Sequence, residues 1–278
     1  MPVNNGYAAA DWRLLSSGYN DGPTNMAIDE ALLEAIAQGN SPPTLRIYGW
    51  KPACLSLGFR QSYAIVNVEY CHTSGWDVVR RPTGGRAILH TDELTYSVCA
   101  PATEPRVRGS VLESYRRLSK ALLAGLDLMG LSPARAEPDP QTIPMNSPAC
   151  FDEPSNYEIT VDRRKLVGSA QMRKKGVVLQ HGSIPLRGDP ARIVPALRFN
   201  DVANQQALAD HLGRNAITLE YAQGHETSFA VTAGQLVEGF AQTLNLNLLP
   251  GELTKEEELA VRRLIALKYA NDDWSKRL

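Results

Sequence analysis

Apolar residues recur at helical spacing in several stretches of the chain. The pattern predicts helices at 25–38, 111–129, 201–211, 232–244 and 254–269. The first stretch ends at Gly39, a residue typical of helix C-termini. Two others begin with a capping box, Ser110 with Glu113 and Thr254 with Glu257, in which each side chain can satisfy a free backbone amide. Helices are therefore expected along the whole chain.

Short apolar and β-branched runs lie between these helices. They predict strands at 44–50, 53–58, on both sides of Gly84-Gly85, and at 157–162, 165–171 and 176–186. The last three follow one another closely and are expected to be antiparallel. Strands and helices are mixed without a strict βαβ rhythm, which favours an α+β fold. We therefore expect a mixed, largely antiparallel sheet flanked by helices.

Composition and charge narrow the classes of function. The chain has 278 residues, of which 43% are hydrophobic and 21% charged, as in an ordinary soluble globular protein. A net charge of -1 gives no indication of nucleic-acid binding. No apolar run approaches the ~20 residues that span a bilayer, and the start does not resemble a signal peptide. We expect a cytoplasmic protein that binds neither nucleic acid nor membrane.

The cysteines and the common motifs argue against a metal or nucleotide site. Cys54, Cys71, Cys99 and Cys150 are widely spaced and contain no C-x-x-C pair. The chain has no G-x-x-x-x-G-K-[ST], no G-x-G-x-x-G after a strand, no H-E-x-x-H and no G-x-S-x-G. Cys54 and Cys99 lie in apolar strands and are interpreted as core thiols. We expect no metal and no cofactor.

The segment around Gly84 and Gly85 is a candidate ligand-binding loop. Glycines can adopt positive φ and expose backbone amides to an oxyanion or a carbonyl. Arg80, Arg81 and Arg86 crowd the same turn, and their repulsion favours a ligand or an acidic partner. A β-hairpin with a solvated basic tip is the alternative interpretation.

Cys150 is a second candidate, because it lies in a polar stretch from 131 to 154 that predicts a long loop. A thiol in such a loop attacks well at neutral pH only if a nearby cation lowers its pKa. Lys165 is the nearest basic residue that a hairpin could bring back toward it. An inert loop cysteine remains the alternative.

Three segments together resemble the lipoate-protein ligase and octanoyltransferase family. They are RRPTGGRAILHTDELTYSV, ACFDEPSNYEITVDRRKLVGSAQMRKKGVVLQHGSI and the tail KYANDDW, at 80–98, 149–184 and 268–274. Within the family, the chain is most similar to the cysteine-dependent octanoyltransferases of lipoate assembly. The resemblance implies a catalytic domain like that of biotin and lipoate ligases at 12–250, with a C-terminal helical segment at 251–278 packed on it.

The resemblance also implies roles for individual residues. Cys150 would accept the acyl group and Lys165, in K-x-x-G-S-A-Q, would assist it. The substrate would be bound by Arg80, Gly84, Gly85, Arg86, His90, Gly168, Ser169 and Ala170. Arg86 stands where ATP-dependent ligases of the family carry a third glycine, which narrows the room for a nucleotide. From the residues alone, a structural, hydrogen-bonded role is favoured for both His90 and His181, and shaping of the pocket is the alternative.

The implied reaction moves octanoyl from octanoyl-acyl carrier protein through a Cys150 thioester to a lysine of a lipoyl-domain protein, such as the glycine cleavage H protein. Conversion of a thioester to an amide is downhill and requires no ATP. Three alternatives remain open: amidotransfer between lipoyl-domain proteins, ATP-dependent lipoate ligation, and a catalytically silent acyl-binding protein. The basic run at 163–175 could steer acidic carriers or form a solvated hairpin edge.

Overall fold

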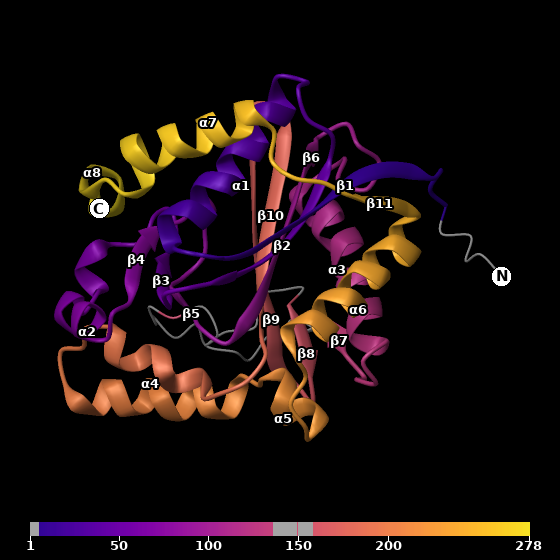
Figure 1. Cartoon of the computed structure of the whole chain (residues 1–278). Coiled ribbons are helices and arrows are strands. Elements are labelled where there is room, and N and C mark those ends of the chain that lie inside the picture. Colours follow the sequence, from indigo (N-terminus) through magenta and orange to yellow (C-terminus); the bar gives the residue numbers. More distant parts are fainter. Residues whose placement is uncertain (1–5, 136–148, 150–157) are drawn as a thin grey trace.

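The computed structural model describes residues 6–135, 149 and 158–278. Its centre is an eight-stranded sheet with the order β11-β1-β2-β6-β10-β9-β8-β7 (Figure 1). These strands are β1 (Ala10–Asn20), β2 (Thr44–Trp50), β6 (Glu93–Pro101), β7 (Ala134–Arg135), β8 (Ile159–Val161), β9 (Arg164–Lys174), β10 (Val177–Pro185) and β11 (Leu246–Pro250). The β11-β1-β2 pairings are parallel and the others are antiparallel. The expected mixed, largely antiparallel sheet is confirmed.

A second sheet of three strands lies beside the first. It contains β3 (Cys54–Leu57), β4 (Asp77–Arg80) and β5 (Ile88–His90) in the order β4-β3-β5. The strands on both sides of Gly84-Gly85 therefore do not pair with each other, and the hairpin alternative is wrong. The reason is that the chain after β4 continues past the end of β3: the Arg81 amide donates to the Leu57 carbonyl and the Phe59 amide donates to the Thr83 carbonyl.

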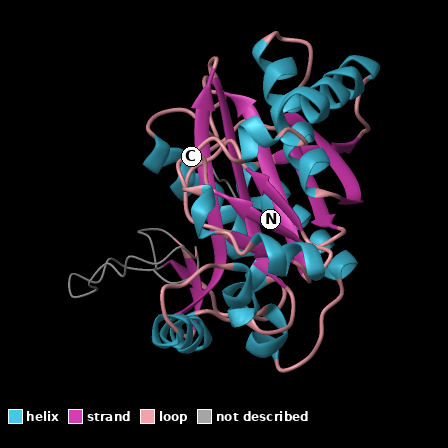
Figure 2. Ribbon diagram, turned by 90° about the vertical axis from the view of Figure 1, so that its left-hand side faces the viewer, coloured by secondary structure: helices cyan, strands magenta, loops and turns pink. Residues whose placement is uncertain are grey.

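Helices cover both faces of the large sheet (Figures 1 and 2). They are α1 (Gly22–Ala37), α2 (Val68–Thr73), α3 (Val111–Asp127), α4 (Val202–Asn215), α5 (Leu219–Gln223), α6 (Phe229–Leu244), α7 (Lys255–Leu264) and α8 (Asp272–Ser275). Short 3₁₀ turns lie at Tyr63–Ile65 and Pro190–Ala196, and a π-helical turn at Ile265–Tyr269. The five predicted helices are all present, and both predicted capping boxes form.

Alternation along the strands divides the core into layers. On β2, Leu45 and Ile47 pack toward α3 and α6, whereas Tyr48 and Trp50 pack toward α1. A third cluster joins the small sheet to α2, α4 and the turn at 190–196. Because strand side chains alternate between faces, the face of the sheet under α1 is free to carry a different set of groups from the α3–α6 face.

The C-terminal segment packs against the N-terminal half of the chain. Buried Glu257 of α7 binds Arg13 of β1 at 2.6 Å, and Glu30 of α1 accepts a hydrogen bond from the Tyr269 hydroxyl at 2.6 Å. Lys268 also donates to Glu30, at 2.5 Å. The domain boundary at residue 250 stays a prediction. None of the described helices is both long and apolar enough to span a membrane.

Sequence patterns did not reveal β1 and β11. The polar Ser16-Ser17-Gly18 interrupts β1, where the pairing with β2 shifts register between Ser16 and Tyr19 and Gly18 has a φ of +62°. Strand β11 is short and follows Asn245, which ends α6 in the left-handed conformation. Both strands depend on their partners more than on their own alternation.

Candidate active site

A cavity lies at the junction of the two sheets and α1. It holds about 430 Å³ of empty space, including the part open to solvent, and its wall is mainly apolar. Its lining comes from α1, from strands β2, β3, β5, β6, β9 and β10, and from the loop between β4 and β5. It consists of Met26, Tyr48, Trp50, Ser56, Arg81, Gly85, Ile88, His90, Thr95, Gly168, Ser169, Ala170, His181, Gly182 and Ser183. Its apolar wall suits an apolar group, and we refer to it as the acyl cavity.

Burial distinguishes the two ends of the acyl cavity. Met26, Tyr48 and Trp50 are 0–4% exposed and belong to the core under α1. Gly85 is exposed and Ala170 is half-buried. The inner end is therefore the Met26–Trp50 side, and the mouth lies between the Gly85 loop and strand β9.

The Gly84-Gly85 loop owes its shape to glycine at two separate places. Gly85 has a φ of +90°, a backbone conformation that glycine adopts readily because it has no Cβ. A Cβ on Gly58 would lie 1.8 Å from the Gly85 carbonyl oxygen, so only glycine at 58 lets the two segments touch. Gly84 is exposed and does not have positive φ, and it lies outside the acyl cavity.

Buried Arg81 stabilises this loop through hydrogen bonds to its backbone. Its guanidinium donates to the Gly84 carbonyl at 2.8 and 3.1 Å and to the Arg86 carbonyl at 2.7 Å. It also donates to the Ser56 carbonyl at 3.0 Å and to the Ser56 hydroxyl at 3.1 Å. Sequence reasoning placed Arg81 in the turn but did not select it as a site residue. Arg86, which was selected, is half-buried, and its backbone carbonyl accepts one of these hydrogen bonds.

Arg80 does not face the acyl cavity. Its fully buried guanidinium donates to the carbonyls of Gly58, Gln61 and Ser275 at 2.6–3.2 Å. In return, the Trp274 indole donates to the Arg80 carbonyl at 2.8 Å. The observed contacts of Arg80 are structural, and its contact with substrate stays a prediction. Arg80 ends β4 and Arg81 follows it, and adjacent residues of an extended chain point in opposite directions. Arg80 ties the loop to the C-terminal segment.

A buried carboxylate holds His181 on one wall of the cavity. Asp29 of α1 is fully buried and accepts hydrogen bonds from Arg46 at 2.8 Å, Tyr48 at 3.0 Å and His181 Nδ1 at 3.0 Å. Burial opposes ionisation of Asp29, but Arg46 and His181 outweigh it and its pKa is lowered. Burial lowers the pKa of His181, and this effect outweighs the hydrogen bond to Asp29, which raises it. A neutral His181 then accepts at Nε2 from the Thr83 hydroxyl, 2.6 Å away.

A second carboxylate orients His90 in the same way. His90 Nδ1 donates to Glu93 Oε1 at 2.7 Å, and His90 Nε2 lies 2.8 Å from the Ser56 hydroxyl. Trp50 stacks on the imidazole with ring centroids 4.0 Å apart. Burial raises the pKa of Glu93, but His90 and Ser183 outweigh it and the pKa is lowered. His90 lines the acyl cavity, its hydrogen bonds also serve the structure, and its contact with substrate stays a prediction.

Strands β9 and β10 form another wall of the cavity. Gly168, Ser169 and Ala170 of the K-x-x-G-S-A-Q stretch all line it, and their contact with substrate stays a prediction. Gly182 of β10 pairs with Ser169, and a Cβ there would lie 2.4 Å from the Ser169 hydroxyl. Glycine at 182 therefore lets the strands and the Ser169 hydroxyl approach closely.

Lys165 lies on the same strand and on the cavity side of it. Ile159 opposes Val167 and its neighbour Thr160 opposes Lys165, because the β8–β9 pairing is shifted by a bulge. Opposed residues share a face and successive ones alternate, so Lys165 faces the same side as Gly168. Lys165 is buried and forms an ion pair with buried Glu158. With regular alternation Lys165 would face away from the cavity. The bulge turns it to the cavity side.

Cys150, the expected nucleophile, lies outside the described residues. The residue before it, Ala149, forms a parallel bridge with Ala87, next to the cavity-lining Ile88. Cys54 and Cys99 are fully buried, and burial raises the pKa of each thiol well above its usual value. Their interpretation as core thiols is confirmed. The described residues contain no cluster of three side chains able to hold a metal ion.

The basic run at 163–175 does not form one patch. Arg163 and Arg164 lie at the start of β9 and Lys174 at its end, so the whole strand separates them. At the far end, Arg173 donates to the Gly109 carbonyl and Lys174 pairs with Glu30. These charges serve local packing, and steering of a carrier by one combined patch is not supported.

Several groups of the site escaped sequence reasoning. They are polar or aromatic residues inside segments that read only as apolar helix or strand, among them Asp29, Tyr48, Ser56 and Glu93. The available signal was a carboxylate in the middle of a buried helix, at Asp29, and another opening a buried strand, at Glu93. Buried carboxylates require partners, which points to a polar network.

Comparisons with known proteins agree on one family. Residues 21–241 match the family model of the lipoyl protein ligase A/B catalytic domain. The chain is 44% identical to a protein of Kyrpidia tusciae named octanoyltransferase LipM, over 96% of this chain and 98% of that protein. It is 43% identical to the protein of the same name from Moorella thermoacetica, covering 97% and 99%.

Among solved structures, a bipartite lipoate protein ligase of Thermoplasma acidophilum, described with its E2 lipoyl domain, superposes with a TM-score of 0.81. It is 21% identical, and 96% of each chain is covered. At that identity the likeness shows the fold alone.

Proposed function

The chain belongs to the lipoyl protein ligase A/B catalytic domain family, and we propose that it is an octanoyltransferase of lipoate assembly. Full-length relatives that carry this name support the activity. The observation that carries the proposal is an apolar cavity whose β9 wall continues, on the same side, to the buried Lys165. The donor is a carrier-protein thioester, and the acceptor is a lysine of a lipoyl-domain protein such as the glycine cleavage H protein.

The reaction has two transfers. In the first, the Cys150 thiolate attacks the thioester carbonyl of the donor, a new carbon–sulfur bond forms, and the carrier thiol leaves and takes up a proton. In the second, the neutral amine of the acceptor lysine attacks the Cys150 thioester. An amide forms, and the Cys150 thiol is regenerated with the proton that the amine loses. Each bond formed replaces one broken, so no ATP is required.

Lys165 supports both transfers electrostatically. A cation near a thiol lowers the thiol pKa and so raises the fraction of thiolate. The ion pair with Glu158 holds Lys165 in place and moderates its charge, because the carboxylate offsets part of its field. Backbone amides near the mouth of the cavity would stabilise the tetrahedral oxyanion.

The acyl cavity selects a medium chain. Burial of the six methylenes of octanoyl contributes about 5 kcal/mol, at ~0.8 kcal/mol for each. An acetyl group would gain almost none of this. The buried inner end, at Met26, Tyr48 and Trp50, sets an upper limit on the length of the acyl chain.

A donor and acceptor screen tests the proposal. Purified enzyme is incubated with octanoyl-carrier protein and with each candidate acceptor, without ATP, and the products are followed by intact mass. We expect the H protein to gain one octanoyl group and Cys150→Ala to be inactive. Octanoylation that requires ATP, or a thermal shift with ATP and magnesium, would indicate a ligase instead.

A further inference from the structure

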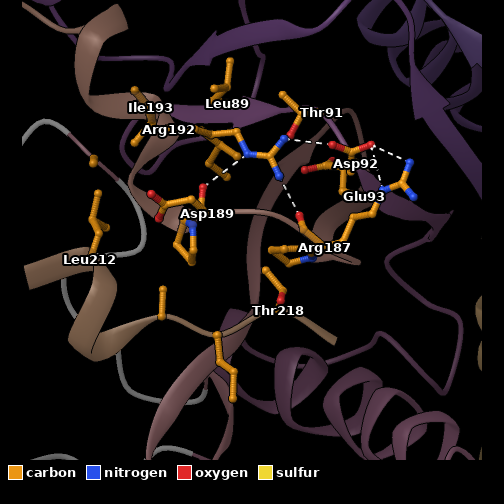
Figure 3. Close-up of a pocket in the computed structure, with 17 residues that line it drawn as sticks. Leu89, Thr91, Asp92, Glu93, Arg187, Asp189, Arg192, Ile193, Leu212 and Thr218 are labelled. Carbon is orange, nitrogen blue, oxygen red and sulfur yellow. Dashed lines mark hydrogen bonds and ion pairs between the residues drawn. The ribbon is translucent and has the colours of Figure 1, made fainter. Parts of the chain in front are cut away.

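A second cavity lies beside the acyl cavity, on the other side of Ile88, which lines both. It holds about 540 Å³ of empty space, including its open part. Its floor is apolar, with Leu89, Ile193, Leu212 and Ile217 among its residues (Figure 3). We call it the arm cavity.

The arm cavity borders the segments that lead to the proposed reacting groups. Ala149, which precedes Cys150, is part of its lining. Ala216 and Ile217 are part of it too, and they attach to Lys165: Ala216 bridges to Lys165, and the Ile217 amide donates to the Lys165 carbonyl at 3.0 Å. A chain in the arm cavity would therefore lie next to Ala149 and to the residues that bond to the Lys165 backbone.

The charged groups on its rim already have partners within the protein. Asp92 binds Arg192 at 2.8 Å and Arg187 at 3.3 Å, as the dashed lines in Figure 3 show. The Asp189 side chain accepts from the Ala191 amide at 2.8 Å. Glu93, behind the wall, is held by His90. Asp92, Arg187, Arg192 and Glu93 thus have ion-pair partners, and burial of a further charged group without a partner would be costly.

From these observations we infer that the arm cavity binds the pantetheine arm of the thioester donor, an inference that rests on the proposed function. Between its sulfur and its phosphate this arm is uncharged, with two amides and a branched apolar segment. The apolar floor matches the apolar part, and the hydroxyls of Thr91 and Thr218 on the lining can bond to the amides. The acceptor lysine fits less well, because its side chain has no amide groups to bond to these hydroxyls and is shorter than the arm.

The test fills the arm cavity from half-buried positions. Leu89→Trp and Thr91→Trp each add bulk to the lining, and Val202→Trp adds the same side chain at a position 79% exposed on α4, outside the cavity. Circular dichroism and thermal melting identify the variants that fold. Acyl-enzyme formation is measured with octanoyl-pantetheine and with the octanoyl thioester of ethanethiol, which lacks the arm.

We expect the folded cavity variants to raise the KM for octanoyl-pantetheine about tenfold or more, and to change the rate with octanoyl-ethanethiol by less than about twofold. Val202→Trp should behave like wild type. Equal loss with both thioesters would overturn the inference, because the substitution would then act on the reacting groups. So would normal acylation combined with slowed transfer to the lipoyl-domain lysine, which would assign the cavity to the acceptor.

A binding measurement separates failure of this inference from failure of the proposed function. S-methylpantetheine cannot be acylated, and its binding is measured by calorimetry. We expect saturable binding to wild type and to Val202→Trp that weakens about tenfold or more in Leu89→Trp or Thr91→Trp. If wild type forms no acyl-enzyme but this pattern holds, the site stands and the transferase mechanism fails. Equal binding by all variants, or none by wild type, would refute the site.

Discussion

Met26 should set the upper limit of acyl chain length. Its side chain lines the acyl cavity, is 1% exposed, and lies in the same core cluster as Tyr48 and Trp50. Those two aromatic residues are held in place, Tyr48 by its hydrogen bond to Asp29 and Trp50 by one to Thr95 at 2.8 Å. Met26 is therefore the flexible part of the inner wall. Met26→Ala would open space at that end without removing a polar contact.

The expected change in specificity follows from the added burial. Decanoyl has two methylenes more than octanoyl, worth about 1.6 kcal/mol if both are buried. This corresponds to about a 15-fold rise in the decanoyl-to-octanoyl ratio of kcat/KM. The same substitution should reduce the free energy of unfolding by about 2–5 kcal/mol, because it deletes a buried side chain.

Acyl-enzyme formation from an equimolar mixture of octanoyl and decanoyl thioesters, read by intact mass, measures the ratio directly. Ile28→Ala is the control, because Ile28 is also a buried residue of α1 but does not line the acyl cavity. It should lose stability and keep the wild-type preference. A folded Met26→Ala enzyme with unchanged preference would show that the chain does not reach this end.

Three further changes test other parts of the site. Lys165→Ala should shift the pH midpoint of Cys150 alkylation upward; coincident curves for the two folded proteins would mean that the lysine does not tune the thiol. His181 has a pKa lowered below 6.5 by burial, so the stability tied to its neutral form is present above that pH and is lost as pH falls below it. The melting temperature of His181→Gln should therefore fall less than that of wild type from about pH 7 to about pH 5, and parallel curves would argue against this. Cys99→Ala should cost about 1 kcal/mol or more of stability and keep acyl transfer, and loss of transfer in the folded variant would make Cys99 a chemical group.

The elements of the fold were largely predictable because their signals are local. Capping boxes at Ser110 and Thr254 and the alternation in β9 and β10 marked their elements correctly. The arrangement was harder. A hairpin was the alternative interpretation of the strands around Gly84, but both strands pair with β3, since pairing partners depend on contacts distant in sequence.

In the candidate site, too, local signals were predictable and the long-range arrangement was not. Gly85, His90 and the 168–170 stretch could be selected from motif resemblance, and they line one cavity. The sequence alone does not distinguish Arg80 from Arg81. Only the backbone geometry decides which of the two adjacent arginines faces the acyl cavity. The side that Lys165 faces depends on a bulge whose position the sequence does not mark. Cys150 itself lies outside the described residues, so its role stays a prediction.

The central claim is that octanoyl passes through a thioester on Cys150. Wild-type enzyme is mixed with octanoyl-carrier protein, without acceptor and without ATP, and is examined by intact mass and peptide mapping. The account predicts one added octanoyl group, labile to hydroxylamine and located on Cys150, and none on Cys150→Ala. An enzyme that shows no adduct yet octanoylates its acceptor, or that acts only with ATP, would contradict it.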